Sequence, residues 1–257
     1  MGKPSCWAGW PLQFASVMDH SHKIQATRSE LPMARSMCWH CQSEITGEYF
    51  CDRCVKVQPL SKESDYFTCF GLPRLLTIDS HALETKFYEL SRAFHPDFFQ
   101  RKTDAEQVIS LDNSALLNTA YRTLKDPIRR AEYLVQLEAG SVKDIRTSPP
   151  ADLFEEILEL QEDLDEFRTA SSDDEISERD RLRTKLVDKR EHLEQRQQAM
   201  EADLLSLFTK WDHFQMQDDH DQAVRAEKNA TLKQMREILS NRTYLRNIVN
   251  DLVATIG

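Results

Sequence analysis

Four cysteines near the N-terminus of the 257-residue chain form two C-x-x-C pairs, a pattern whose thiolates bind metal ions. The pairs are Cys38-Trp-His-Cys41 and Cys51-Asp-Arg-Cys54, with nine residues between them. Together they supply a closed tetrahedral set of four soft ligands, which suits zinc better than iron. Because no coordination position stays open for a water molecule, the spacing predicts a structural zinc site. We name residues 38–58 the tetracysteine module.

Two disulfides and a redox-active dithiol are the alternative interpretations of this module. We expect no secretory leader, because no apolar run follows the first basic residues, and a reducing compartment argues against disulfides. A redox dithiol normally uses one C-x-x-C beside a βαβ pattern, and the sequence shows no such pattern. The module is too short to fold on apolar burial alone, so metal binding should supply its folding free energy.

A second chemically distinctive string, His95-Pro96-Asp97, follows a predicted helix over residues 80–94. The apolar residues of that helix recur on one face: Leu83, Phe87, Leu90 and Phe94. Proline disfavours helical backbone at the residue before it, so the helix should end near His95. The result is a rigid, exposed turn that presents an imidazole and a carboxylate, and we name it the HPD corner.

A second helix should follow the HPD corner and complete a helical hairpin. Thr103 and Glu106 have the spacing of a capping box, and Asp126-Pro127 marks the end of this helix. Its apolar stripe is Leu117, Ala120, Tyr121 and Leu124. Taken alone, the HPD corner could be an ordinary surface turn or a catalytic His–Asp pair. No nucleophile is placed beside it, because Cys69 has the surroundings of a small core residue.

Composition narrows the function classes. Hydrophobic residues make up 40% and charged residues 30% of the chain, with six glycines and nine prolines, which favours a helical, water-soluble fold. The net charge of −10 disfavours a nucleic-acid binder, whose affinity comes mainly from lysine and arginine. No apolar run reaches 18 residues, so no membrane-spanning helix is predicted.

The chain divides into four segments. Residues 1–37 form a disordered extension or leader, residues 38–58 the tetracysteine module, residues 65–140 the hairpin domain and residues 152–257 a three-helix bundle. Polar linkers are predicted over 59–65 and 141–151, and a turn over 169–174. The predicted fold is all-α, with a helical hairpin, the bundle and a small zinc-knuckle module of rubredoxin type. The bundle helices are expected at about 152–167 and 176–216 and after residue 221, packed antiparallel.

The motif order in the hairpin domain resembles a J-domain. Asp65-Tyr66-Phe67 and Gly71-Leu72 come first, then the HPD corner, then the string from Asn118 to Pro127, then Arg130-Ala-Glu-Tyr133-Leu. With the tetracysteine module before it and the bundle after it, the layout is similar to HscB, the co-chaperone family of iron–sulfur cluster assembly, in its zinc-bearing form. The resemblance covers about residues 38–257 and leaves residues 1–37 outside it.

The resemblance implies two docking surfaces and no catalytic residue. In J-domains the HPD corner and the preceding helix bind a DnaK-type or HscA-type ATPase chaperone and stimulate its ATP hydrolysis. Asp97 would pair with an arginine of that chaperone in a charge-assisted contact. The implied chaperone-binding residues are His95, Pro96, Asp97, Lys86, Arg92, Arg101 and Lys102. The four basic residues would steer association, although ordinary solvated charge explains them equally well.

The first bundle helix resembles the surface that holds an IscU-type scaffold protein. Eight residues of 152–167 are acidic, and Leu153, Ile157, Leu160 and Leu164 suffice for a core stripe. Phe154 and Leu158 then remain as an apolar edge rimmed by charge, the mark of a partner site, unless they too belong to the core. The implied scaffold-binding residues are Phe154, Leu158, Glu159, Glu162, Glu166 and Tyr244. Glu155 departs from the family, which usually has an apolar residue there, and could weaken scaffold affinity.

The expected function is therefore that of a co-chaperone that delivers an iron–sulfur scaffold to an ATPase chaperone and is not itself an enzyme. A general J-domain co-chaperone for protein folding and a zinc-ribbon nucleic-acid-binding protein are the alternatives. A redox or hydrolytic enzyme that uses the cysteines or His95 is a further one. We expect no nucleic-acid and no membrane partner, leave a homodimer open, and predict a bacterial cytoplasmic location with the mitochondrial matrix as the alternative.

Overall fold

The computed structural model describes residues 37–45, 49–60, 65–139, 153–169, 176–217 and 221–256. Its helices are α1 (Tyr66–Cys69), α2 (Ser80–Ala93), the 3-10 turn η2 (Pro96–Phe98), α3 (Asp104–Lys125), α4 (Pro127–Ala139), α5 (Phe154–Thr169), α6 (Ile176–Gln215) and α7 (Gln222–Ile256). The described residues contain isolated β-bridges in place of strands, so the all-α prediction is confirmed. The predicted extension up to residue 36, the linker over 141–151 and most of the predicted turn near residue 170 lie outside the described residues.

The helix ends of the hairpin domain follow from local sequence. Asp79 caps α2 by accepting hydrogen bonds from the amides of His81 and Ala82. The predicted capping box is present at the start of α3, where Thr103 and Glu106 bond reciprocally. Asp126 ends α3 and caps α4, since its carboxylate accepts from the first free amides of that helix. The hairpin of α2 and α3 is therefore specified locally, as the sequence predicts.

Buried side chains of α2 and α3 hold the hairpin together. Leu83, Leu90 and Phe94 are almost inaccessible, and they face Leu117, Ala120 and Leu124 across the hairpin. Phe87 and Tyr121 are half-buried and stack with a centroid distance of 4.1 Å and an interplanar angle of 11°. Cys69 is buried in the same core, and burial raises the pKa of its thiol, so it is a core residue.

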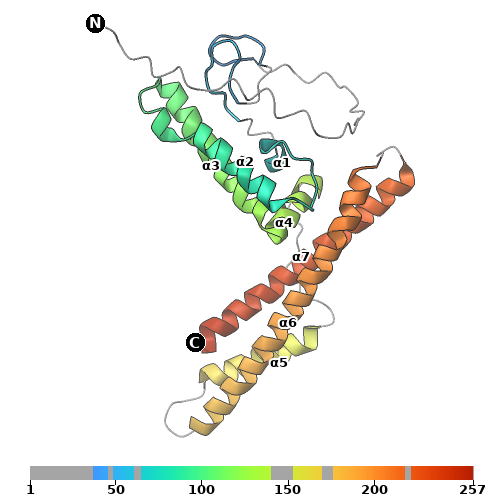
Figure 1. The fold of residues 1–257 in the computed structure, drawn as a ribbon. Helices are drawn as coiled ribbons and strands as arrows, with labels where there is room; N and C mark the ends of the chain where they lie inside the picture. The colour runs from blue at the N-terminus through green and yellow to red at the C-terminus, as the bar shows by residue number, and fades with distance from the viewer. Residues whose placement is uncertain are drawn as a thin grey trace.

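The long helices α6 and α7 run side by side, and α5 covers only one end of the pair (Figure 1). At that end the predicted stripe of Leu153, Ile157, Leu160 and Leu164 is buried against α6 and α7. Figure 1 shows the hairpin domain at the other half of the pair, where α4 contacts α7. The three-helix arrangement is thus confined to one half of the bundle.

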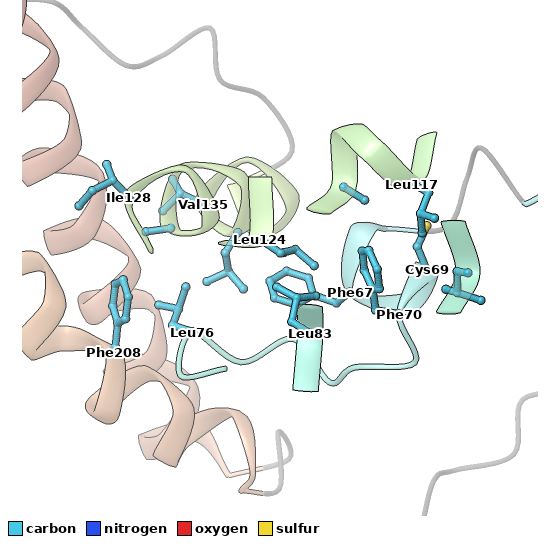
Figure 2. Packing of buried hydrophobic residues seen from close by; sticks show 14 of the residues in the cluster. Phe67, Cys69, Phe70, Leu76, Leu83, Leu117, Leu124, Ile128, Val135 and Phe208 are labelled. Atoms are coloured by element: carbon cyan, nitrogen blue, oxygen red, sulfur yellow. The ribbon is translucent and has the colours of Figure 1, made fainter. Parts of the chain in front are cut away.

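The apolar stripe of α6 divides between two cores. Leu182, Leu186 and Leu193 pack with α5 in the bundle core. Leu204, Phe208 and Trp211 instead pack with the hairpin domain, together with Met235 and Leu239 of α7. Figure 2 shows Phe208 on α6 facing the hairpin domain near Leu76 and Ile128. The hairpin domain therefore shares a core with the half of the α6–α7 pair that α5 does not cover, which the sequence pattern alone did not indicate.

None of the described helices combines the length and the apolar character that crossing a bilayer requires.

Candidate functional site

The tetracysteine module consists of two loops with matching backbone geometry. In the first loop the amide of Gln42 donates to the carbonyl of Cys38 at 3.0 Å, and in the second the amide of Val55 donates to Cys51 at 2.8 Å. Gln42 and Val55, which follow the second cysteine of each pair, both adopt a φ of 56°. Left-handed backbone is strained for a β-branched residue such as Val55. The two turns place the two cysteine pairs opposite each other.

The four cysteine sulfur atoms lie within 4.8 Å of one another. The Sγ atoms of Cys38 and Cys54 are 3.6 Å apart, and those of Cys41 and Cys51 are 3.7 Å apart. These spacings are too long for disulfides, whose sulfur atoms are about 2.05 Å apart. They match a tetrahedron of sulfur ligands about 2.3 Å from a central ion, whose edges are about 3.8 Å long. The four cysteines therefore come together as a site that fits a metal ion.

The surroundings of the sulfur atoms also fit a cation. The hydroxyl of Ser43 lowers the pKa of Cys51 to about 6. Burial raises the pKa of Cys38, but the backbone amides around it, including that of His40, lower the pKa by more. Burial raises the pKa of Cys54 to about 12, together with hydrogen bonds to the neighbouring cysteine sulfur atoms, which favour its protonated form. A bound cation would take the place of that proton, and the donor set suits a thiophilic ion such as zinc or iron.

The HPD corner is exposed on the outside of the hairpin domain. The side chain of Asp97 is 70% accessible and that of His95 is 50% accessible. The imidazole Nδ1 of His95 accepts the backbone amide of Asp97 at 3.3 Å and lies 3.6 Å from the Asp97 carboxylate. Gln100 donates to the same carboxylate at 3.2 Å. The corner thus holds an outward-facing carboxylate in a fixed orientation.

The four predicted basic residues near the corner differ in their exposure to solvent. Lys86 lies 3.3 Å from Glu89 on its own helix, and its ammonium group lies 5.8 Å from the ring centre of Tyr49 in the tetracysteine module. Arg92, Arg101 and Lys102 are exposed. Sequence reasoning missed Phe98, which is 68% exposed with its ring centre 6.0 Å from that of His95. The sequence signal that could have identified Phe98 is its position directly after the HPD string.

The predicted scaffold-binding residues occupy two helices. Phe154 is 58% and Leu158 is 50% exposed on one face of α5, so neither is a core residue in this chain. Glu162 and Glu166 are exposed on the same helix. Tyr244 is half-buried on α7, where it packs against the bundle core. Phe154 and Leu158 thus form an apolar pair with acidic neighbours.

Lysines of α6 neutralise part of the acidic face of α5. Lys185 and Lys189 approach the buried carboxylate of Asp163 at 2.7 and 2.9 Å, and Lys189 also lies 3.4 Å from Glu159. Burial raises the pKa of Asp163, but the hydrogen bonds from the two lysines hold it below its usual value. Glu155 is exposed in the first turn of α5, where the helix dipole favours a carboxylate.

Comparisons with known proteins agree with this layout. No protein-family model matches the chain. The mouse "Iron-sulfur cluster co-chaperone protein HscB" is 32% identical over 145 residues, which are 54% of this chain and 62% of the mouse protein. The match therefore spans less than two thirds of that curated relative.

The fold resembles that of a solved human protein. Human co-chaperone protein HscB superimposes with a TM-score of 0.60 at 22% identity, over 85% of this chain and 98% of the human one. Chaperone HscB from Vibrio cholerae has a TM-score of 0.49 at 26% identity, over 74% and 96% of the two chains. The chain thus has the fold of the human co-chaperone HscB and is similar in sequence to the mouse iron–sulfur cluster co-chaperone of that name.

Proposed function

We propose that this protein is a co-chaperone of iron–sulfur cluster biogenesis. The HPD corner would dock on a DnaK-type or HscA-type ATPase chaperone and stimulate its ATP hydrolysis, while α5 would hold an IscU-type scaffold. The observation that carries the proposal is the outward exposure of both predicted surfaces, Asp97 on the hairpin domain and Phe154 with Leu158 on the bundle. The sequence similarity to mouse HscB supports the choice of partners.

The chain itself would bind and orient, and the chaperone would perform the hydrolysis. Asp97 offers a carboxylate to an arginine of the chaperone, and its hydrogen bond from Gln100 limits the orientations that must be lost on docking. The shared core of the hairpin domain and the bundle keeps the two surfaces at a constant separation. A scaffold bound to α5 is then held at a high effective concentration near the chaperone.

The tetracysteine module would hold zinc through Cys38, Cys41, Cys51 and Cys54. With four sulfur ligands the ion keeps no open position and supplies folding free energy to the module rather than catalysis. Metal analysis of the purified protein by mass spectrometry tests this assignment. One zinc per chain is the expected result, and iron in its place would contradict it.

The chaperone half of the proposal is tested by steady-state ATP hydrolysis of a purified DnaK-type chaperone with this protein added. We expect the wild-type chain to raise the rate and His95→Gln to abolish the increase, because the mutation removes the imidazole that holds the corner. His81→Gln is the matched control, since His81 is an exposed histidine at the opposite end of α2. Full stimulation by His95→Gln would contradict the role of the corner.

The scaffold half is tested by isothermal titration with an IscU-type scaffold. Replacing Phe154 and Leu158 by alanine should weaken binding by about 2–4 kcal/mol if both are hot spots, or roughly 30- to 1,000-fold. Leu205→Ala with Val253→Ala is the control, because these apolar side chains are exposed elsewhere on the bundle. If the wild-type chain stimulates the chaperone but binds no scaffold, a general J-domain co-chaperone becomes the better description. Fractionation of cells tests the predicted cytoplasmic location against the mitochondrial matrix.

A further inference from the structure

The tetracysteine module packs against the end of the helix that leads into the HPD corner. Phe94, the residue just before His95, is fully buried. The ring centres of Tyr49 and Phe50 from the module lie 5.7 and 6.3 Å from the Phe94 ring. Val57 of the module is buried in the same core. The module therefore forms part of the support behind the corner.

A second contact joins the module to the start of α3, the helix that follows the corner. Lys56, two residues after the last cysteine, places its ammonium group 2.8 Å from Oε2 of Glu106. The same oxygen accepts the hydroxyl of Thr103 at 2.9 Å and its amide at 3.2 Å, which closes the capping box. Glu106 is only 4% exposed, so its carboxylate depends on these donors.

A third contact links one of the cysteines to the middle of α3. The side-chain amide of Gln58 donates to Sγ of Cys38 at 3.4 Å. The backbone carbonyl of Gln58 accepts from Nδ2 of Asn113 at 2.9 Å, and Oδ1 of Asn113 accepts the amide of Leu60 at 2.8 Å. Asn113 is 2% exposed, so its side chain depends on these two partners, one at the end of the module and one just after it.

We propose that the tetracysteine module, when it holds a thiophilic divalent cation, positions the HPD corner for the chaperone. This inference rests on the proposed function of the corner. Without a cation the short module loses its source of folding free energy. Glu106 then loses the ammonium partner of its buried carboxylate, and Asn113 loses its hydrogen bond to Gln58. Because unpartnered buried groups are costly, the ends of α2 and α3 must rearrange toward water. Loss of the cation therefore loosens the corner and leaves the distant bundle core intact.

Hydrogen exchange of the full chain tests the coupling without any chaperone. The cation is removed with a chelator in one sample, and Cys54→Ser is used in another. In both, amide exchange over residues 94–110 should rise roughly tenfold or more, while exchange over 182–193 of α6 stays unchanged. Unchanged exchange over 94–110 in a chain shown by mass spectrometry to be metal-free would overturn the inference. So would an equal rise in both segments, because that result means general unfolding.

A variant that keeps all four cysteines separates positioning from metal binding. Lys56→Met should retain the cation but raise the concentration that gives half-maximal chaperone stimulation, roughly tenfold, with little change in maximal rate. Lys56→Arg should restore the wild-type value, because it keeps the charge that faces Glu106. Lys233→Met, at an exposed position on α7, is the matched control. A wild-type half-maximal concentration for Lys56→Met would overturn the inference. If the wild-type chain stimulates no chaperone, the proposed function fails, and the exchange experiment still decides the coupling.

Discussion

Asp212 of α6 fastens the bundle to the hairpin domain, and its removal is the sharpest test of the shared core. Its carboxylate accepts the backbone amide of Leu76 at 2.6 Å and that of Thr77 at 2.8 Å. Both amides belong to the segment that leads into α2. Asp212 is only 5% exposed, so water has little access to the site.

The magnitude follows from what Asp212→Ala leaves behind. An unsatisfied buried amide costs about 1–3 kcal/mol, and the amide of Leu76, a fully buried residue, should carry most of this cost. Thr77 is exposed, so water can replace its partner and its amide adds little. The buried guanidinium of Arg130 also loses a nearby opposite charge. We expect a loss of about 2–4 kcal/mol in the free energy of unfolding. Asp212→Asn keeps one acceptor oxygen and should cost about half as much.

Urea unfolding followed by circular dichroism and by tryptophan fluorescence measures this loss. Asp251→Ala is the matched control, because Asp251 forms an exposed ion pair with Arg168 at 3.3 Å, and such pairs contribute about 0–1 kcal/mol. If Asp212→Ala unfolds within about 0.5 kcal/mol of the wild type, within the range of ordinary surface substitutions, the two parts are not held by this contact. The proposal that the two candidate docking surfaces keep a constant separation would then lose its physical basis.

Three further predictions concern other parts of the chain. The pKa of Asp163 lies below its usual value, so its contribution to stability should be present above about pH 4 and lost as the pH falls further. In urea unfolding, Asp163→Asn should therefore lose less stability than the wild type between pH 7 and pH 3. An unchanged slope of stability against pH would contradict the pairing of Asp163 with the two lysines. Phe98→Lys should weaken chaperone docking roughly tenfold in the ATPase assay, because the Phe98 ring is exposed beside His95. The melting temperature should stay unchanged. Unaltered docking would exclude Phe98 from the interface. Gly71→Ala should lower the free energy of unfolding by about 1 kcal/mol, because Gly71 has a φ of 65°, which strains any residue with a Cβ even where the space around it is open. A neutral effect in thermal unfolding would show that the backbone relaxes there.

Local rules were sufficient to predict the helices and the cluster of four cysteines. Helix period placed the apolar stripes of α2, α3 and α5, and proline marked the turn after α2. The C-x-x-C spacing brought the four cysteines into one site, because each pair sits on a single loop and needs only one long-range approach. The exposure of Phe154 and Leu158 also followed from the number of apolar residues in α5, which exceeds what one core stripe can hold.

The sequence by itself determined which residues would form helices, which cysteines would gather in one cluster and which carboxylate would stand at the corner, because these depend on neighbours within one or two turns. Only the tertiary structure decided that part of the α6 stripe belongs to the hairpin core, that Asp212 caps a distant loop, and that Lys56 and Gln58 contact α3. Such contacts join positions dozens of residues apart, where side-chain period gives no information on which apolar or polar groups will meet. They depend on how whole helices pack, and that packing fixes the geometry of the candidate docking surfaces.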